Sequence, residues 1–264
     1  MLTLRNVSKT FNPKTANEKK VLSGLNLHLD RGDFVTIIGS NGAGKSTVLN
    51  AIAGSFLIDA GRILLGKEDI TFKKNYHRAR DIGFLFQDPL KGTAPNMTIE
   101  ENLSLVFMRS PLCTSRIGIT AKDREFFKQK LSSLNLGLED RLKSKVGLLS
   151  GGQRQALTLL MATLITPKVL LLDEHTAALD PGTAEKVQAI TRSIVSENGI
   201  TCLMVTHDIS AALALGNRTI MMDEGKIILD LSQAQKENMT VPSLIERFKD
   251  KSKKQLNNDR MLLS

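Results

Sequence analysis

The sequence has few of the residues that mark certain classes of protein. It contains no tryptophan, one tyrosine and only two cysteines, Cys113 and Cys202, among 264 residues. Two cysteines so far apart cannot form a C-x-x-C zinc or redox pair, so both are expected to be reduced packing residues. No apolar run approaches the roughly 18 residues of a membrane-spanning helix, and the first residues, MLTLRNVSKTF, lack the apolar stretch of a signal peptide. The sequence therefore predicts a cytosolic chain.

Acidic residues are scarce relative to basic ones. The chain has 27 Asp and Glu against 36 Lys and Arg, which gives a formal net charge of +9. This balance excludes an acidic disordered protein and suits a polyanion or an anionic membrane surface as a neighbour. Because 41% of the residues are apolar, the chain can bury a sizeable core in one large domain or two small ones.

Hydrophobic patterns predict an α/β fold. Near the N-terminus, leucines alternate with polar residues, as in half-buried strands of an antiparallel sheet edge. Three continuous apolar runs are typical of buried parallel strands, and helical patterns follow the first and second of them. The alternating leucines are Leu2, Leu4, Leu25, Leu27 and Leu29. The apolar runs are FVTIIG from Phe34, VLLLD to Asp173 and ITCLMVTH to His207. The helical positions are Val48, Leu49 and Ile52 before Gly54, and Val187, Ile190, Thr191 and Ile194.

From about residue 88 to 167, helix signals replace the buried strands. Thr98 and Glu101 form a capping-box pattern, Thr120 opens a second helix, and a third helix follows Ser150. We therefore predict a helical subdomain, residues 88–167, inserted in an α/β domain of residues 1–232. The second helix carries Phe126, Phe127, Leu131 and Leu134.

The last residues, 233–264, are polar and basic. They contain one amphipathic piece around Leu244, Ile245 and Phe248. We predict that they form a loosely held basic tail.

A glycine-rich loop lies between the first buried strand and the first helix. It fits the pattern G-x-x-x-x-G-K-[ST], whose glycines let backbone N–H groups turn inward around a phosphate at a helix N-terminus. Lys45 can reach the β- and γ-phosphates, and Ser46 can ligate Mg²⁺. The loop therefore predicts a nucleoside triphosphate site. Its residues are Gly39, Ser40, Asn41, Gly42, Ala43, Gly44, Lys45 and Ser46, followed by Thr47.

Two carboxylates end the second buried strand. Asp173 lies at the carboxyl edge of the predicted parallel sheet, which is the usual ligand crevice, and it can hold Mg²⁺. Glu174 follows it and can polarise a water molecule for attack on the γ-phosphate. A solvated strand end is the structural alternative, but the phosphate loop upstream favours a functional pair.

The segment Leu149-Ser150-Gly151-Gly152-Gln153 resembles the L-S-G-G-Q signature motif of the ATP-binding cassette family. The resemblance runs from about residue 2 to 230 and implies a P-loop NTPase core with a mixed sheet, an N-terminal antiparallel β edge and an inserted helical subdomain. Further matches follow in the family's order. Phe11 resembles the aromatic residue that stacks on adenine, Gln87 in FLFQDP the Q-loop glutamine, Ala178-Leu179-Asp180 the D-loop, and His207 in VTHD the switch histidine.

The resemblance implies an ATPase that powers solute transport. Glu174, His207, Lys45 and Gln87 would be its catalytic residues, and Ser46, Gln87 and Asp173 would hold Mg²⁺. Two copies would pair head to tail, with Ser150, Gly151, Gly152, Gln153 and Asp180 of one copy completing the ATP site of the other. A separate membrane permease would dock on the inserted helices, at the inner face of the membrane, with a solute-binding protein outside. A nucleic acid partner is not expected.

Some of these residues also have purely structural explanations. Ser150 and Gln153 form a capping box, and Asp180 before Pro181 is a helix N-cap followed by proline at the first helical position. Both roles are compatible with the nucleotide contacts that the resemblance implies. His28 and His77 lie in no motif, and we expect them at the surface.

One departure from the family pattern bears on the type of transporter. Family members most often have proline where His175 stands, and we expect this histidine to mark a subgroup rather than to catalyse. The variant E-H-T-A-A-L-D-P is similar to that of importers with an external binding protein, some of them for aromatic amino acids. The alternative function is a soluble cassette ATPase that acts in iron–sulfur assembly or on nucleic acid. The chain lacks the long heptad segment and cysteine cluster of repair-type members.

Overall fold

The computed structural model describes residues 1–109 and 118–251 of the chain. Its N-terminal part is an antiparallel sheet of four strands in the order β2-β1-β4-β5, as the alternating leucines predict. All five of those leucines are buried, so they share the face that packs on the rest of the molecule. The strands are β1 (Leu2–Phe11), β2 (Lys19–Leu29), β4 (Ala60–Leu65) and β5 (Glu68–Asp69).

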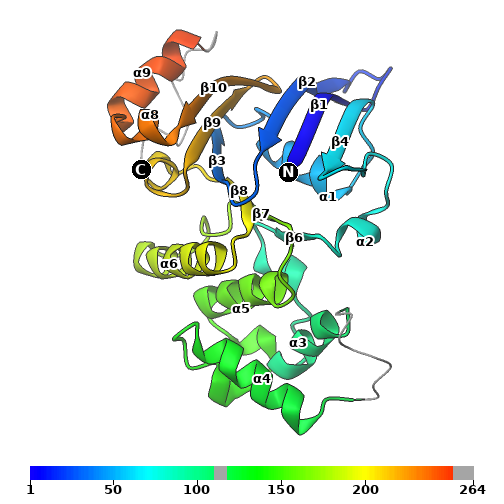
Figure 1. The fold of residues 1–264 in the computed structure, drawn as a ribbon, viewed down its shortest axis with the longest axis vertical. Helices are drawn as coiled ribbons and strands as arrows, with labels where there is room; N and C mark the ends of the chain where they lie inside the picture. Colours follow the sequence, from blue (N-terminus) through cyan, green and yellow to red (C-terminus); the bar gives the residue numbers. More distant parts are fainter. Residues whose placement is uncertain (110–117, 252–264) are drawn as a thin grey trace.

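A second sheet of six strands forms the centre of the molecule (Figure 1). Its strands lie in the order β10-β9-β3-β8-β7-β6, all parallel except β10, which runs antiparallel to β9. The predicted mixed sheet is confirmed, although the sequence analysis identified only three of these strands. They are β3 (Phe34–Gly39), β6 (Ile82–Leu85), β7 (Val169–Asp173), β8 (Thr201–Val205), β9 (Arg218–Asp223) and β10 (Lys226–Ser232).

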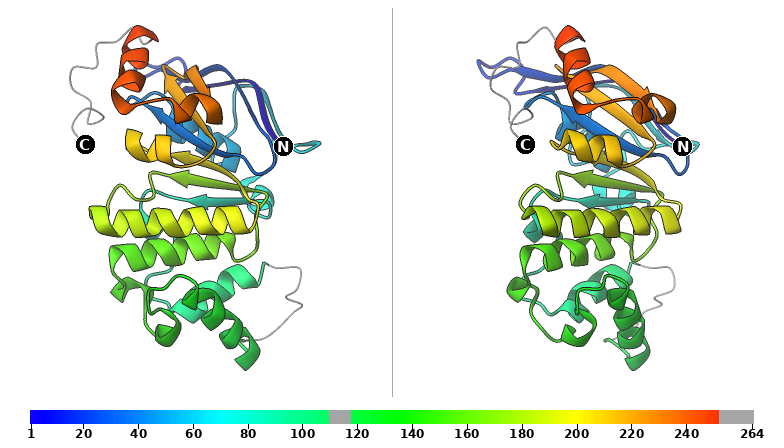
Figure 2. Two further views of the ribbon diagram at one scale, coloured as in Figure 1. Left: turned by 60° about the vertical axis from the view of Figure 1, so that its left-hand side comes forward. Right: turned by 90° about the vertical axis from the view of Figure 1, so that its left-hand side faces the viewer.

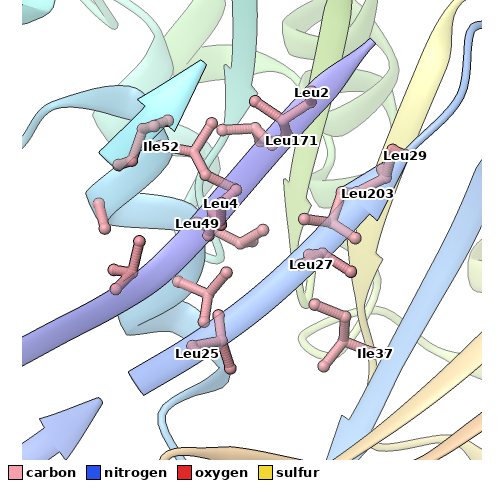
Figure 3. Packing of buried hydrophobic residues seen from close by; sticks show 14 of the residues in the cluster. Leu2, Leu4, Leu25, Leu27, Leu29, Ile37, Leu49, Ile52, Leu171 and Leu203 are labelled. Atoms are coloured by element: carbon pink, nitrogen blue, oxygen red, sulfur yellow. The ribbon is translucent and has the colours of Figure 1, made fainter. Parts of the chain in front are cut away.

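Both faces of this sheet are covered, which explains the continuous apolar runs. On one face, Leu171 and Leu203 pack against α1 (Lys45–Ala53) and the leucines of β1 and β2, as Figure 3 shows. On the other face, Leu170 and Leu172 belong to a cluster shared with the helices after β7 and β8. Those helices are α6 (Pro181–Glu197) and α7 (Ile209–Ala214).

The described residues between β6 and β7 form a helical subdomain with its own core (Figures 1 and 2). Thr98, Thr120 and Ser150 each cap a helix through a capping box, so the three predicted helix starts are confirmed. Phe127 and Leu131 are fully buried in this core. Its elements are the α-helices α3 (Ile99–Phe107), α4 (Ala121–Ser132) and α5 (Gly151–Thr163), and the 3₁₀ turns η1 (Pro89–Gly92), η2 (Glu139–Arg141) and η3 (Val146–Leu148).

The expectation of a loosely held tail is wrong for residues 233–251. These residues form α8 (Gln233–Glu237) and α9 (Val241–Lys251), which lie beside β9 and β10 in Figures 1 and 2. Leu244 and Phe248 are buried in a cluster with Ile209 and Ala212 of α7. The amphipathic pattern alone did not reveal this docking, because the receiving surface is built from distant segments.

We expect Phe248→Ala to lower the free energy of unfolding by about 3–5 kcal/mol, because a fully buried aromatic ring leaves a cavity when it is truncated. Chemical denaturation followed by circular dichroism measures the change. Arg247→Ala is the matched control, because Arg247 is the exposed neighbour on the same helix and its loss should change the free energy by less than about 0.5 kcal/mol. Equal effects of the two substitutions would contradict the docking of α9.

Two expectations from composition can be compared with the structure. Cys202 is a free, fully buried thiol in β8, and burial raises its pKa, which fits a reduced packing residue. Cys113 lies outside the described residues. Within residues 1–109 and 118–251, no helix combines the length and hydrophobicity needed to cross a bilayer.

Candidate functional site

The phosphate loop joins β3 to α1, and close packing requires two of its glycines. Gly39 has φ 152°, and a Cβ atom there would lie 2.2 Å from the carbonyl oxygen of Met222 in β9. Gly44, the N-cap of α1, has φ 95°, and its Cβ would lie 2.9 Å from the carbonyl oxygen of Val21 in β2. A side chain at either position would push the loop away from its neighbours.

Lys45 is the first residue of α1 and is only 5% exposed. Its ammonium group donates to the carbonyl oxygens of Gly39, at 2.6 Å, and Ser40, at 3.0 Å. The Ser40 hydroxyl donates to Asp223 of β9 at 3.1 Å. A buried cation and the N-terminus of α1 therefore meet inside one loop, which is an arrangement suited to phosphate. Of the remaining loop residues, Asn41 and Gly42 are exposed, Ala43 is buried and Thr47 is half-buried.

Ser46 and Asp173 come together across the sheet. The Ser46 hydroxyl donates to Asp173 Oδ1 at 2.8 Å, because β7 lies two strands from β3 and ends at the same edge. Burial raises the pKa of Asp173, and the Glu174 carboxylate adds to this rise. The hydrogen bond from Ser46 lowers the pKa but does not cancel the rise. A hydroxyl and a carboxylate side by side are oxygen donors of the kind that Mg²⁺ prefers, so the residues fit this ion.

Glu174 and His207 form the second pair. The Nε2 atom of His207 lies 2.6 Å from Glu174 Oε1, and these side chains are 33% and 11% exposed. Burial opposes ionisation of Glu174, but the hydrogen bond from His207 and the charges of His207 and Lys45 lower its pKa. Glu174 is thus a carboxylate beside the phosphate loop and in reach of a histidine. It has φ 46°, a left-handed conformation that is uncommon without glycine.

Arg78, which no sequence pattern indicated, fixes the other end of α1. This buried arginine donates to the carbonyl oxygens of Ala51, at 2.8 Å, and Ile52, at 2.9 Å, in the last turn of the helix. It lies at the end of α2 (Asn75–Arg78). A cation at a helix C-terminus satisfies otherwise unpaired carbonyl groups and complements the helix dipole. No local sequence signal links Arg78 to α1.

Two predicted site residues lie apart from these pairs. Phe11, at the end of β1, packs edge-on against Phe56 with ring centroids 5.2 Å apart. Gln87 is exposed in the loop after β6, and within the described part of the chain it makes no hydrogen bond to Ser46 or Asp173.

The signature and D-loop residues lie at helix starts. Ser150 is the exposed N-cap of α5, followed by Gly151, Gly152 and Gln153, in the helical subdomain and away from α1 (Figure 1). Asp180 is the exposed N-cap of α6, and its Oδ1 accepts from the Thr183 amide at 3.0 Å. The predicted capping roles are therefore confirmed.

The remaining histidines were assigned no catalytic role. His28 and His77 are exposed, as predicted. His175 is instead buried, and its Nε2 lies 3.2 Å from Oγ1 of Thr191 in α6.

Comparison with known proteins identifies relatives over most of the chain. It is 44% identical to a tyrosine transport ATP-binding protein of Clostridioides difficile over 94% of this chain and 98% of that protein. It is 34% identical to an aliphatic sulfonates import ATP-binding protein of Pseudomonas fluorescens, over 87% of this chain and 76% of the relative.

Solved structures agree with the sequence relatives. A dimeric post-hydrolysis structure of the ATP-binding cassette MJ0796 with ADP and Pi matches with a TM-score of 0.75 and 29% identity, over 88% of this chain and 99% of that one. The ADP conformation of the cassette MJ1267 matches with a TM-score of 0.77 and 29% identity, over 94% and 98%. The family model for ABC transporters matches residues 22–177. The chain therefore belongs to the ABC transporter family and is one of its ATP-hydrolysing, ATP-binding subunits.

Proposed function

We propose that this chain powers the import of an aromatic amino acid through a separate membrane permease, as a peripheral subunit at the cytoplasmic face. The observation that carries the ATPase part is the convergence of two side-chain pairs, Ser46 with Asp173 and Glu174 with His207, beside the phosphate loop. A phosphate cradle, a site for a divalent cation and a carboxylate base are the parts that hydrolysis of ATP needs.

Each part has a distinct role in this proposal. The loop N–H groups and Lys45 bind the β- and γ-phosphates. Glu174, ionised at neutral pH, accepts a proton from the attacking water, and His207 donates a hydrogen bond to a γ-phosphate oxygen. Ser46 and Asp173, together with Gln87, would hold Mg²⁺, which would supply neutralisation of phosphate charge. Phe11 stacks on the adenine.

The site is completed by a second copy of the chain. The start of α5, where Ser150 and Gly151 are exposed, is a helix N-terminus suited to an anion. It lies in the helical subdomain and not at this chain's phosphate loop. A head-to-tail dimer brings this helix start to the γ-phosphate bound by the other copy, with Asp180 at the same interface. The similarity to a dimeric cassette supports this arrangement.

A groove between the α/β part and the helical subdomain suits the permease. It has a volume of about 880 Å³, and it is lined by both parts, including Tyr76 and Phe84 on one side and Val106, Arg109 and Met161 on the other. Tyr76 is 60% exposed, which is high for an aromatic side chain and typical of an interaction site. The family resemblance implied a partner surface on the inserted helices, and this groove adds residues of the α/β part to that surface.

The substrate class rests on similarity. The relative named for tyrosine transport shares 44% of its residues with this chain over nearly the whole length of both. In this proposal, the ATPase supplies the energy for transport. The permease and an external solute-binding protein recognise the transported solute. An importer for tyrosine or a related aromatic amino acid is the proposed assembly.

We expect the double variant Tyr76→Ala and Arg109→Ala to lower tyrosine uptake by about tenfold or more in membranes that carry the permease. Its ATPase activity without permease should stay within about twofold, because neither residue touches the phosphate site. Uptake of labelled tyrosine into reconstituted vesicles that enclose ATP and carry the ATPase on their inner face, with the solute-binding protein added outside, measures the effect. Lys128→Ala, on the exposed face of α4, is the control and should leave uptake unchanged.

The same vesicles test the substrate. Unlabelled phenylalanine or tryptophan should compete with tyrosine, whereas spermidine and a sulfonate should not. Competition by spermidine alone would overturn the aromatic assignment but leave the importer. Strong ATPase stimulation by DNA or RNA, with no permease retained in a detergent pull-down, would overturn the transport function itself.

A further inference from the structure

His175 is a buried polar residue that the proposed mechanism leaves unused. It directly follows Glu174, in the turn between β7 and α6, and it is 3% exposed. A buried imidazole costs free energy unless its polar atoms have partners. Its Nε2 atom lies within hydrogen-bond distance of the hydroxyl of Thr191, which is 1% exposed in the middle of α6.

The direction of this hydrogen bond follows from the chemistry of threonine. The Thr191 hydroxyl has one proton, and it donates that proton to the carbonyl oxygen of Val187 at 2.8 Å. The Thr191 oxygen is therefore the acceptor for His175, and Nε2 of the imidazole carries the hydrogen at 3.2 Å.

The backbone before His175 is held in an unusual conformation. Glu174 has φ 46°, and its amide donates to Val205 at 3.0 Å, while its carbonyl oxygen accepts from Ala177 at 3.0 Å. A residue with a side chain adopts this conformation only where the surroundings enforce it. In this conformation, the carboxylate of Glu174 reaches His207 at 2.6 Å.

We propose that His175 is a positioning residue for Glu174. Its buried ring ties the turn to the middle of α6 through Thr191, and this anchor keeps Glu174 in the left-handed conformation that directs its carboxylate to the reacting water. The inference rests on the proposed role of Glu174 as the general base. It adds that the position of the Glu174 carboxylate depends on the hydrogen bond between His175 and Thr191, on the opposite side of the turn.

The anchor also connects two parts of the proposed dimer site. The turn that begins at Glu174 ends at Asp180, the N-cap of α6, and Thr191 lies further along the same helix. A small displacement of a general base lowers the rate steeply, because proton transfer depends on distance and alignment. The hydrogen bond from His175 to Thr191 therefore fixes the position of Glu174 relative to α6, the helix whose start faces the second copy in the proposed dimer.

The test separates positioning from mere packing. His175→Leu keeps an apolar side chain of similar reach but removes the donor, and we expect it to lower kcat about 10- to 100-fold while KM for ATP changes less than about twofold. His175→Gln retains an N–H donor at a comparable distance from the backbone and should recover at least half of the lost kcat. A larger fall in kcat for the glutamine variant than for the leucine variant would overturn the proposal.

Thr191 provides an independent check. Thr191→Val removes the acceptor with little change in shape and should lower kcat as His175→Leu does, whereas Thr191→Ser should stay near wild type. The double variant His175→Leu with Thr191→Val should have the same kcat as the slower single variant, because both substitutions remove the same hydrogen bond. Additive losses, or a loss that appears in KM instead of kcat, would show two separate packing defects and overturn the proposal.

The role of Glu174 is tested separately in the same series. If Glu174→Gln leaves the rate near wild type, the proposed general base fails and the positioning role fails with it. If Glu174→Gln slows hydrolysis but His175→Leu changes kcat less than twofold, only the positioning role fails. The double variant Glu174→Gln with His175→Leu should hydrolyse ATP no more slowly than Glu174→Gln alone, since no carboxylate remains to be positioned.

Discussion

Replacing Lys45 with alanine is expected to lower ATP hydrolysis by at least 10²- to 10³-fold, to the level of the assay background. The buried ammonium group lies inside the phosphate loop, and its stabilisation of transition-state charge is lost completely with the side chain. Phosphate release under single-turnover and steady-state conditions measures the change. Turnover close to that of the wild type would contradict the assignment of the phosphate loop.

The structure changes one part of this expectation. The sequence pattern places Lys45 in the glycine-rich loop, and a loop side chain usually contributes little to the stability of a fold. Lys45 is instead a buried residue of α1 that bonds two loop carbonyl groups. We therefore expect Lys45→Ala also to loosen the loop, at a cost of about 1–3 kcal/mol in the free energy of unfolding. Lys67→Ala, exposed between β4 and β5, removes the same charge elsewhere and should change neither quantity.

The second large effect is expected for Glu174→Gln. The amide has nearly the shape of the carboxylate but cannot accept the proton of the attacking water, so hydrolysis should slow by about 10²- to 10⁴-fold. ATP binding should persist, because the phosphate loop and Ser46 are untouched. Equilibrium binding of a fluorescent ATP analogue, measured beside the rate, separates the two effects.

Slow hydrolysis in this variant should also trap the proposed dimer. With ATP bound and not consumed, the head-to-tail pair has no route to open, and sizing chromatography with ATP and Mg²⁺ should show twice the monomer mass. Glu185→Gln, an exposed carboxylate on α6, is the control and should keep both a normal rate and a monomer peak. A monomer of the Glu174→Gln variant at all ATP concentrations would contradict self-association of the isolated chain.

Much of the fold and site could be predicted because the relevant signals act over a few residues. The helix starts at Thr98, Thr120 and Ser150 are each set by a side chain that bonds three positions away, so the sequence contains both partners. The phosphate loop is equally local, since its glycines, lysine and serine are consecutive. The buried runs before Asp173 and His207 also predicted strands, because both faces of a central strand are covered.

The contacts that assemble the site were decided by tertiary structure. Ser46 and Asp173 are 127 positions apart, and they meet only because β3 and β7 flank β8 and end at one edge of the sheet. The sequence predicted each strand but not this order, since strand order depends on how all the crossovers pack. The same holds for Gly39, whose need for glycine comes from Met222 in β9, a strand that the sequence analysis did not identify.

The C-terminal helices and His175 show the same limit. The spacing of Leu244 and Phe248 indicated an apolar face, but only the fold supplies α7 as the surface that buries it. His175 was recognised as a departure from the family pattern, yet its partner Thr191 had been assigned only to a helix face. The sequence by itself determined which segments form helices, strands and a phosphate loop, because those choices depend on neighbouring residues. The tertiary structure decided which side chains meet, because burial of apolar surface fixes the strand order and helix packing that bring distant residues together.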